Sequence, residues 1–317
     1  MLKLMPAALL LLTLASGCTE RREEKPVTLA ISPWSGYEYL YLAQELGFFQ
    51  KVGINVKIRE LYSLSDSQRA FTQGRTDGMA SSLAEVVQAA GMIDHQIHVA
   101  LVVDYSDGAD VIISQAKFTD LRALQGKKVA AEPGSIGVVL LSSALAYYDM
   151  DINDIEFVAL DQPAIVAELR AGTIDAGVTF PPFSNQLNKD IGIKTIFTSA
   201  QIPGQIVDVV SFRGDLELST EWIKKFHTAW QMALDYTELH PAEADGIMAG
   251  HEQISVTEFR VSRENTNLVS ADRQMHAMDL INQAGTIANT CRTLGRLKSI
   301  RENCQTLLER IKLRSVR

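Results

Sequence analysis

The chain has 317 residues, of which 46% are apolar and 21% charged, and its formal net charge is −8. These values exclude a disordered chain, a collagen-like repeat and a disulfide-dense miniprotein. An acidic chain of this size is a poor candidate for nucleic-acid binding, which needs clustered Lys and Arg, so no nucleic-acid partner is expected. At about 150 residues per domain, the length predicts two folding units.

The N-terminus resembles a bacterial lipoprotein signal. Lys3 precedes an apolar run over 4–14 that is too short to span a bilayer. The segment Leu-Ala-Ser-Gly-Cys follows and ends at Cys18, whose thiol would accept the diacylglycerol. We expect residues 1–17 to be a signal peptide and 18–26 a tether, with the mature chain anchored at Cys18 by acyl chains such as palmitate. An ordinary signal peptide with an incidental cysteine is the alternative.

Strand and helix patterns alternate from residue 27 to residue 113. A strand is predicted over 27–31, a helix over 39–49, and a strand over 54–58, where apolar and polar residues alternate with period two. Such a βαβ unit favours a parallel pair with a right-handed crossover. The alternation continues with predicted elements at 66–73, 78–80, 83–90, 98–103 and 111–113.

A second alternating series begins after residue 118. Its strands and helices are expected at 128–131, 138–148, 155–160, 164–171, 176–179, 181–187 and 195–198. A strand over 207–212 then returns to the first unit, and the remainder is predicted to be helical. The first of these helices is capped by Ser219 and ended by Pro241, and its Trp and Phe residues are interpreted as core. Two α/β lobes joined by two hinge crossings give this order, with ligand between them.

The C-terminal segment 291–317 is basic, with eight Lys or Arg against two acids, on an otherwise acidic body. We expect a helical tail that touches anionic lipid or a membrane partner, with a solvated helical face as the alternative. Cys291 and Cys304 lie in an oxidising compartment if the chain is exported, so they are candidates for a disulfide. Two free helical thiols are the alternative.

Motifs of familiar enzymes and metal sites are absent from the sequence. There is no phosphate loop, no GxGxxG, no HExxH, no GxSxG and no CxxC. His95 and His98 are the only close histidine pair, and a loop without metal is the favoured interpretation. These observations favour a binding protein without a metal or cofactor over an enzyme.

Four predicted strand ends carry residues suited to ligand binding. The segment 32–37 offers an aromatic pair, and 77–82 offers two hydroxyls at a helix start, where simple capping is the alternative. The segment 104–110 has three carboxylates, with a solvated turn as the alternative, and 132–137 offers free amides at a helix start. Phe180 at a further strand end would close the pocket from the second lobe.

The chain resembles periplasmic substrate-binding proteins of ABC transporters, in the nitrate/sulfonate/taurine and thiamine-precursor (NMT1/THI5-like) group. The residues that carry the resemblance are SPWSGYEYLYLAQELGFFQKVGINVKI, TDGMASSLAEVVQAA, LQGKKVAAEPGSIG, LRAGTIDAGVTFPPF and IVDVVSF, which cover about 27–290. It implies an α/β fold, the two-lobed type II periplasmic binding protein or Venus flytrap, here with a helical C-terminal extension. Lobe 1 is then 27–113 plus 206–290, and lobe 2 is 114–205.

The resemblance also implies a function and a site. The chain would be a lipid-anchored solute receptor on the outer side of a membrane, facing the periplasm or the exterior, that delivers a small molecule to an ABC permease. The alternative is a sensory subunit that presents the same flytrap to a membrane signalling protein. Related enzymes that make a thiamine pyrimidine carry a cysteine-rich iron motif that is absent here. The residues placed at the cleft are Trp34, Tyr37, Ser81, Ser82, Asp104, Tyr105, Gly134, Ser135, Ile136, Phe180 and Asp208.

The residue types at the predicted cleft indicate the character of the ligand. Aromatic rings come from Trp34, Tyr37, Tyr105 and Phe180, and carboxylates from Asp104, Asp107, Asp110 and Asp208. None of the four strand-end segments contains Lys or Arg. A neutral or cationic nitrogen compound, such as an amine or a pyrimidine-like heterocycle, is therefore favoured over an oxyanion. An oxyanion held by the helix start at Gly134–Ile136 stays open as the alternative.

Overall fold

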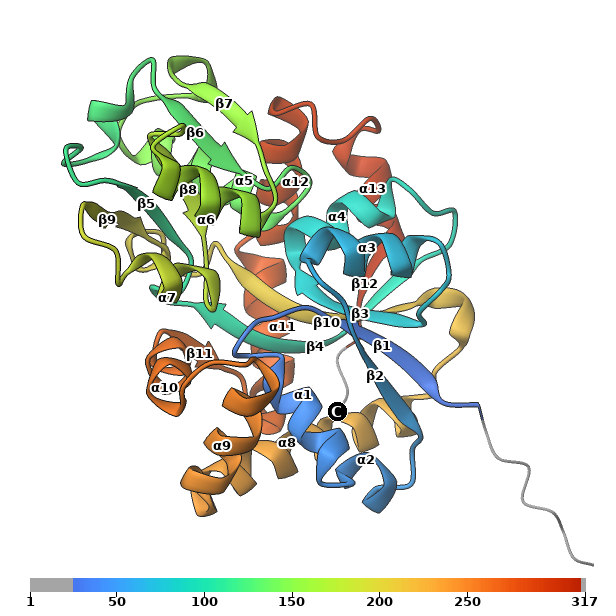
Figure 1. Ribbon diagram of the computed structural model, residues 1–317. Coiled ribbons are helices and arrows are strands. Elements are labelled where there is room, and N and C mark those ends of the chain that lie inside the picture. Colours follow the sequence, from blue (N-terminus) through green and yellow to red (C-terminus); the bar gives the residue numbers. More distant parts are fainter. Residues whose placement is uncertain (1–24, 315–317) are drawn as a thin grey trace, which may run out of the picture.

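The computed structural model describes residues 25–314, and within them the chain forms two α/β lobes (Figure 1). Each lobe is built on one β-sheet with helices packed against it. The predicted two-lobed α/β architecture is therefore correct. Cys18, the predicted signal peptide and most of the predicted tether lie outside the described residues. Among residues 25–314, no helix is both long enough and apolar enough to span a bilayer.

The larger sheet has seven strands. They are β1 (Val27–Ile31), β2 (Val56–Glu60), β3 (Gly78–Ser82), β4 (Ile97–Ser106), β10 (Val207–Arg213), β11 (Thr266–Leu268) and β12 (Ile311–Leu313). The order is β11-β4-β10-β3-β1-β2, with β12 also paired to β4. β1 is parallel to β2 and β3, as the βαβ pattern predicts, and β10 is antiparallel to β3 and β4. The returning strand predicted over 207–212 is thus present.

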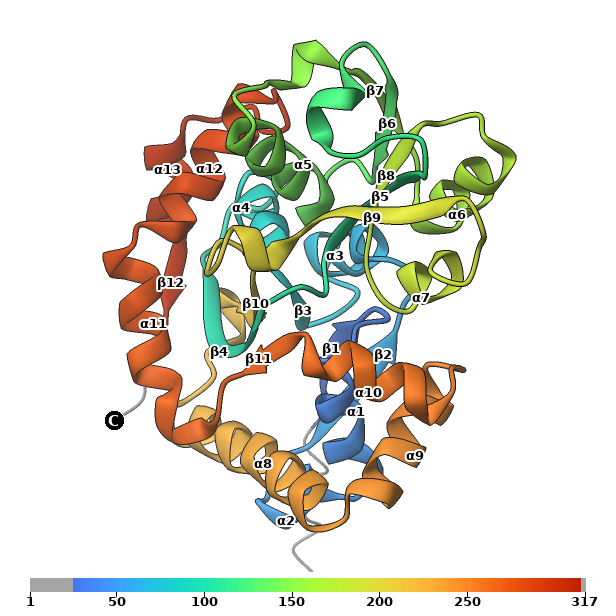
Figure 2. The same ribbon diagram turned by 90° about the vertical axis from the view of Figure 1, so that its left-hand side faces the viewer.

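The smaller sheet has five strands. They are β5 (Val111–Gln115), β6 (Lys128–Ala131), β7 (Glu156–Ala159), β8 (Ala176–Thr179) and β9 (Ile193–Thr198), in the order β7-β6-β8-β5-β9. β6 is parallel to β7 and β8, whereas β5 is antiparallel to β8 and β9. The antiparallel β5 and β9 lie next to the two places where the chain passes between the sheets, as Figure 2 shows.

Helices cover both sheets. Those with the larger sheet are α1 (Glu38–Glu45), α2 (Phe48–Lys51), α3 (Leu64–Thr72), α4 (Leu83–Ala90), α8 (Thr220–Leu239), α9 (Pro241–His251), α10 (Val256–Glu264) and α11 (Gln274–Gln283). Those with the smaller sheet are α5 (Ile136–Tyr147), α6 (Gln162–Ala171) and α7 (Phe183–Leu187). The Ser219 hydroxyl caps α8 by accepting the Trp222 amide at 3.1 Å. Phe226 and Trp230 of α8 are fully buried, so the interpretation of this stripe as core is correct.

Two short connections join the sheets. The chain leaves β4 for β5 through residues 107–110, and it returns from β9 to β10 through residues 199–206. Ser199 holds the connections together, because its hydroxyl lies 2.8 Å from that of Ser106 and accepts the Gly108 amide at 2.7 Å. These connections form the hinge. The predicted lobe boundaries near residues 113 and 205 lie close to it and stay a prediction.

Three local expectations differ from the structure. The helix predicted over 39–49 is divided at Gly47, whose φ of 67° ends α1 before α2 begins. β4 continues to Ser106, so Asp104 and Tyr105 belong to the strand and not to the loop that follows it. β11 was not predicted, because a three-residue strand is too short to show a period.

The C-terminal segment is only partly the predicted helical tail. α12 (Thr286–Arg296) and α13 (Cys304–Arg310) are helices, but residues 311–313 form β12, which pairs in parallel with the start of β4. Leu307 on α13 is fully buried and Ile311 on β12 is nearly so. Arg292, Lys298 and Arg301 are exposed, so contact of the basic side chains with lipid or a membrane partner stays a prediction, with a solvated face as its alternative. Long-range pairing with β4 decides the structure of the segment's last residues.

Cys291 on α12 and Cys304 at the start of α13 form a disulfide, with Cα atoms 5.7 Å apart. It closes a loop with a sequence separation of 13. By the chain-entropy relation, such a bridge stabilises the fold by about 3 kcal/mol. We expect the double variant Cys291→Ala/Cys304→Ala to have a free energy of unfolding lower by that amount, and therefore a lower urea midpoint. The check is denaturant unfolding with and without reductant: reductant should shift the wild type to the variant's midpoint and leave the variant unchanged.

Candidate functional site

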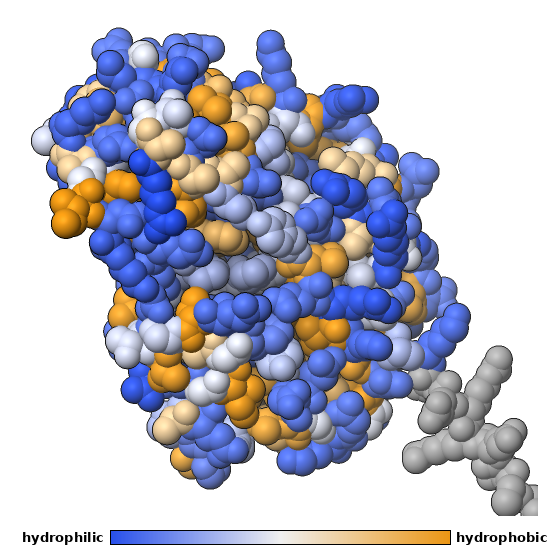
Figure 3. Space-filling view, in the orientation of Figure 1, coloured by the Kyte–Doolittle hydropathy of each residue, from blue (hydrophilic) through white to orange (hydrophobic). Residues whose placement is uncertain are grey.

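A small cavity lies between the two lobes, beside the hinge. Its lining comes from the loop after β1, from α3, from the hinge and β10, and from two strand ends of the smaller lobe. The lining residues are Pro33, Trp34, Tyr37, Leu64, Asp110, Ile136, Phe180 and Asp208. In the space-filling view the surface is hollowed where the lobes meet (Figure 3). The cavity has a volume of about 10 Å³, room for about one water molecule, so the lobes are closed over it.

Aromatic side chains from both lobes meet at this cavity. The rings of Trp34 and Phe180 pack edge to face with their centroids 6.1 Å apart. Tyr37 lies beside Trp34, at a centroid distance of 6.4 Å. Because Trp34 belongs to the larger lobe and Phe180 to the smaller one, this contact exists only while the lobes are closed. A flat ligand inserted between them would replace the ring–ring contact with its own faces.

Buried carboxylates lie at and behind the wall of the cavity: Asp110 and Asp208 line it, and Asp104 lies behind Trp34. Asp104 and Asp208 are opposite one another in register on β4 and β10. The Trp34 indole N–H donates to Asp104 Oδ2 at 3.0 Å, and the Tyr37 hydroxyl donates to Asp208 Oδ1 at 2.5 Å. Oδ1 of Asp104 and Oδ2 of Asp110 are buried without any hydrogen-bond partner among the described residues. The neighbouring Asp208, whose pKa is raised, can donate its carboxyl proton to Asp104. Among the described residues no group donates to Asp110 Oδ2, so this acceptor is left for a ligand.

Burial controls the charge of these carboxylates. It raises the pKa of Asp104 to about 7 and that of Asp110 to about 6. Burial, together with the nearby Asp104 and Asp110, raises the pKa of Asp208 well above its usual value. No Lys or Arg is among the residues that line the cavity. A cation or a strong N–H donor would supply the missing compensation, because it favours the ionised carboxylates.

Gly36 makes the close approach of Trp34 and Asp104 feasible. A Cβ atom at this position would lie 2.0 Å from Asp104 Oδ2 and 2.9 Å from Trp34 Nε1. Any larger residue would therefore displace the carboxylate or the indole. Glycine at position 36 is therefore required for steric reasons, and the sequence pattern alone does not reveal this requirement.

The helix start that was a candidate for oxyanion binding is already occupied. The Ile136 amide of α5 donates to Glu85 Oε1 at 2.8 Å, and Glu85 lies on α4 in the other lobe. Burial raises the pKa of Glu85 to about 7. Ser135 caps its own helix by accepting the Gly137 amide at 3.1 Å. The Ile136 amide is therefore not free for an oxyanion, which argues against the alternative of an oxyanion at Gly134–Ile136. Its hydrogen bond with Glu85 joins the two lobes instead.

Polar contacts elsewhere also hold the lobes closed. The Ser65 hydroxyl of α3 donates to Glu132 Oε1 at 2.7 Å. On the opposite rim, Lys189 forms an ion pair with Glu258 at 2.5 Å, and the side-chain amide of Asn185 donates to the Ser262 hydroxyl at 3.1 Å. Opening of the lobes would break these contacts and expose the cavity.

The structure separates the sequence-predicted site residues into three groups. Trp34, Tyr37, Ile136, Phe180 and Asp208 line the cavity, and Asp104 lies directly behind Trp34. Ser81, Ser82 and Gly134 serve the local structure: Ser81 donates to the Ser82 carbonyl, Ser82 caps α4 with Glu85, and Gly134 takes a φ of 76° in its turn. The contacts of Ser82 are those of simple helix capping, which was the alternative interpretation of this residue.

Two predicted residues lie away from the cavity. Tyr105 is half-buried and its hydroxyl donates to the Ala277 carbonyl at 3.4 Å, on the side of β4 next to α11. Asp107 is exposed and accepts the Asn267 side-chain amide at 3.0 Å, so the prediction that its carboxylate faces the ligand is wrong. The reason is its place in the hinge turn, outside the strand that carries Asp104 into the interior.

Glu85, Pro33 and Leu64 belong to the site or its closure and were not predicted. A signal for Glu85 was present, since Ser82 and Glu85 have the spacing of a capping box before an apolar run. Glu85 also accepts a hydrogen bond from the Ile136 amide of the other lobe, and no local sequence pattern predicts this contact. Pro33 and Leu64 contribute only shape.

Comparison with known proteins identifies the family and the fold of the chain. The NMT1-like family model matches residues 20–249. A protein of Aspergillus parasiticus named 4-amino-5-hydroxymethyl-2-methylpyrimidine phosphate synthase is 25% identical over 232 residues, 68% of this chain and 67% of that protein. A putative binding protein of Brucella abortus is 27% identical over 153 residues, and the match spans less than half of each chain, 48% and 46%.

A taurine-binding periplasmic protein of Escherichia coli is 24% identical over 61% of this chain and 54% of that protein. Among solved structures, the periplasmic aliphatic sulphonate binding protein SsuA of Escherichia coli superposes with a TM-score of 0.67 at 17% identity, covering 83% of this chain and 94% of that one. A Candida albicans protein with the generic periplasmic binding protein fold gives a TM-score of 0.72 at 17% identity, covering 92% and 98%. The fold is that of the periplasmic binding proteins, and the chain belongs to the NMT1-like family.

Proposed function

We propose that the protein is a lipid-anchored extracytoplasmic solute-binding protein that captures a small nitrogen-containing molecule and delivers it to an ABC importer. The observation that carries the proposal is the interlobe cavity, where an unpartnered oxygen of Asp110 and the carboxyl group of Asp208 lie beside aromatic rings from both lobes. A ligand that bridges the lobes binds the closed state more tightly than the open one, and it shifts the equilibrium by that difference. A permease would then recognise the closed shape.

Amines, amidines and amino-substituted heterocycles fit this site better than oxyanions. Their N–H groups can donate to the free oxygen of Asp110 and to the carboxyl group of Asp208, and a flat ring can lie between Trp34 and Phe180. An oxyanion would face several buried carboxyl groups, and the nearby Ile136 amide is already bonded to Glu85. The names of the relatives include a methylpyrimidine phosphate synthase, putative binding proteins and a taurine-binding protein. We propose binding without catalysis for this chain.

Calorimetry on protein that has been unfolded and refolded, to remove carried-over solute, tests the proposal. The panel contrasts thiamine pyrimidines and other nitrogen heterocycles with taurine, alkylsulfonates, nitrate and bicarbonate. We expect micromolar binding within the first set and its loss in Trp34→Ala, because this ring forms one wall of the cavity. Micromolar binding to the second set alone, or an unaffected Trp34→Ala variant, would contradict the proposal.

The lipid anchor can be tested separately. Cys18→Ala removes the thiol that would carry the acyl chains, so we expect the variant to leave the membrane fraction and become soluble in the envelope. Fractionation of cells that produce either form, followed by immunoblotting, measures this. Recovery of the variant in the membrane fraction at the wild-type level would refute lipidation at Cys18 and leave the binding proposal untouched.

A further inference from the structure

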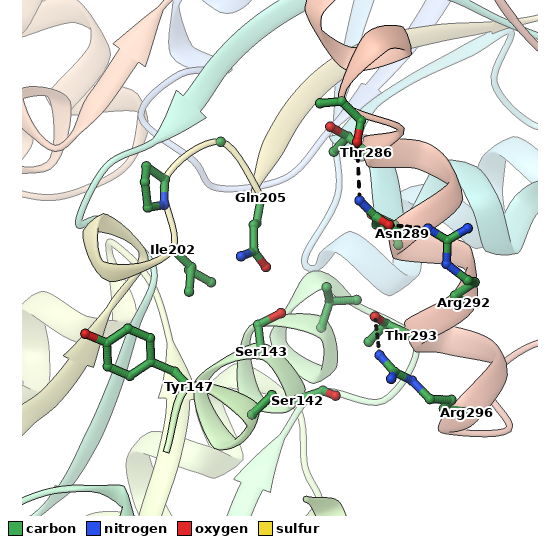
Figure 4. A pocket seen from close by; sticks show the side chains of 16 residues that line it. Ser142, Ser143, Tyr147, Ile202, Gln205, Thr286, Asn289, Arg292, Thr293 and Arg296 are labelled. Atoms are coloured by element: carbon green, nitrogen blue, oxygen red, sulfur yellow. Dashed lines mark hydrogen bonds between the residues drawn. The ribbon is translucent and has the colours of Figure 1, made fainter. Parts of the chain in front are cut away.

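A second and larger cavity lies behind the hinge. Its volume is about 780 Å³, and its walls are α5 of the smaller lobe, the returning connection at residues 202–205, and the C-terminal helix α12 (Figure 4). In Figure 2, α5, α12 and α13 lie on one side of the hinge and α6, α7 and α10 on the other. None of the residues named above as lining the interlobe cavity lines this one.

The lining of this cavity is basic and rich in hydroxyl groups. Arg292 and Arg296, one turn apart on α12, are part of it, and no Asp or Glu is. Each guanidinium donates to a side chain of its own helix, Arg292 to Asn289 and Arg296 to Thr293. In the described part of the chain neither arginine has a carboxylate within 4.0 Å, although the body of the protein is strongly acidic.

The remaining polar groups face α12 across the cavity. In Figure 4, Ser142 and Ser143 of α5 and Gln205 of the hinge connection lie opposite Thr293 and Arg296. Hydroxyl, amide and guanidinium donors on two sides suit a group with several acceptor oxygens and a negative charge. Tyr147 and Ile202 add apolar surface at one end, which suits a ligand with an organic body.

We propose that this cavity is a second binding site, for a phosphate monoester group. Arg292 and Arg296 would pair with the phosphate, and Ser142, Ser143 and Gln205 would donate to its other oxygens. The phosphate belongs either to a soluble ester or to the headgroup of an anionic phospholipid at the membrane surface. This proposal does not depend on the ligand of the interlobe cavity.

The position of the site couples it to the motion of the lobes. α12 packs against α4 of the larger lobe and against α5 of the smaller one, and residues 202–205 belong to the hinge. A ligand that contacts all three walls holds the lobes at their present spacing. Binding there therefore favours the closed arrangement, by the difference in affinity between the two arrangements.

Titration with inorganic phosphate and glycerol 3-phosphate, followed by calorimetry, tests the site on the purified protein. Binding to vesicles of phosphatidylcholine, with and without phosphatidic acid, forms the second arm. The test variant is Arg292→Ala/Arg296→Ala. The control is Lys57→Ala/Arg59→Ala, which removes the same charge from exposed positions on β2. We expect the test variant to weaken binding at least about 10-fold in one arm and the control to match the wild type.

Hydrogen exchange locates the effect. Added glycerol 3-phosphate should slow amide exchange in α5, residues 202–205 and α12 of the wild type, and not of the test variant. Binding only to vesicles that contain phosphatidic acid, lost in the test variant, identifies the lipid as the source. The proposal is overturned if neither probe binds, if both double variants lose affinity equally, or if the protected amides lie elsewhere.

Discussion

Asp104→Asn is expected to weaken binding of the cleft ligand by about 100-fold. Asparagine keeps the size of the side chain and can still accept the Trp34 indole N–H, so the aromatic wall should stay in place. What it removes is the carboxylate that a cationic ligand would hold in its ionised form, because the pKa of Asp104 without ligand is about 7. A charge-assisted hydrogen bond in a buried site contributes about 1.5–3 kcal/mol, which corresponds to a loss of about 10- to 150-fold. Calorimetry with the best ligand of the screen measures the change.

Asp107→Asn is the matched control. It removes the same charge only three residues away, but this carboxylate is exposed and pairs with Asn267. We expect an affinity within about twofold of the wild type, since exposed charges at this distance are screened. Equal losses in the two variants would indicate a general effect of charge on a cationic ligand. An unchanged Asp104→Asn variant would remove Asp104 from the site.

The free energy of unfolding is expected to decrease as the pH rises from about 4 to about 7. In the folded chain the pKa of Asp104 is about 7, that of Glu85 about 7 and that of Asp110 about 6, all raised by burial. In the unfolded chain these groups titrate near pH 4. Between these values the folded state binds more protons than the unfolded state, so the stabilisation is fully present below pH 4 and is lost as the pH passes the folded pKa values. Each such group contributes a slope of up to about 1.4 kcal/mol per pH unit.

Asp104→Asn isolates one of these groups. The asparagine does not titrate, so the variant should lose part of the slope and be more stable than the wild type at pH 8. Urea unfolding at pH 5, 6.5 and 8, compared between the two proteins, measures this. A wild type whose stability is flat or rising from pH 5 to pH 8, with an identical slope in the variant, would contradict the burial of an uncompensated carboxylate. If Asp104→Asn loses affinity and is more stable than the wild type at pH 8, the buried carboxylate serves binding at a cost in stability.

Much of the fold can be predicted from the amino-acid sequence. Alternating βα patterns, a strand that returns after the second series and an apolar stripe on α8 depend on neighbours in sequence, so they show in a local pattern. The aromatic residues Trp34 and Phe180 also follow predicted strand ends, one in each lobe, and ligands of open α/β sheets bind beyond the carboxyl ends of the strands. The order of lobes and the general place of the site therefore follow from the sequence and from rules of topology.

Tertiary structure decided which of the acidic residues are buried next to the interlobe cavity. Asp104 is buried because β4 extends through it and pairs it with Asp208 on a strand about a hundred residues later, whereas Asp107 lies in the hinge turn and is exposed. Glu85 reaches the helix start of the other lobe, and β12 adds to β4 from the far end of the chain. Sequence alone determined the residue types and the alternation of elements. The partners of Asp104, Glu85 and β12 were settled only by folding, because contacts between residues far apart in sequence leave no local pattern.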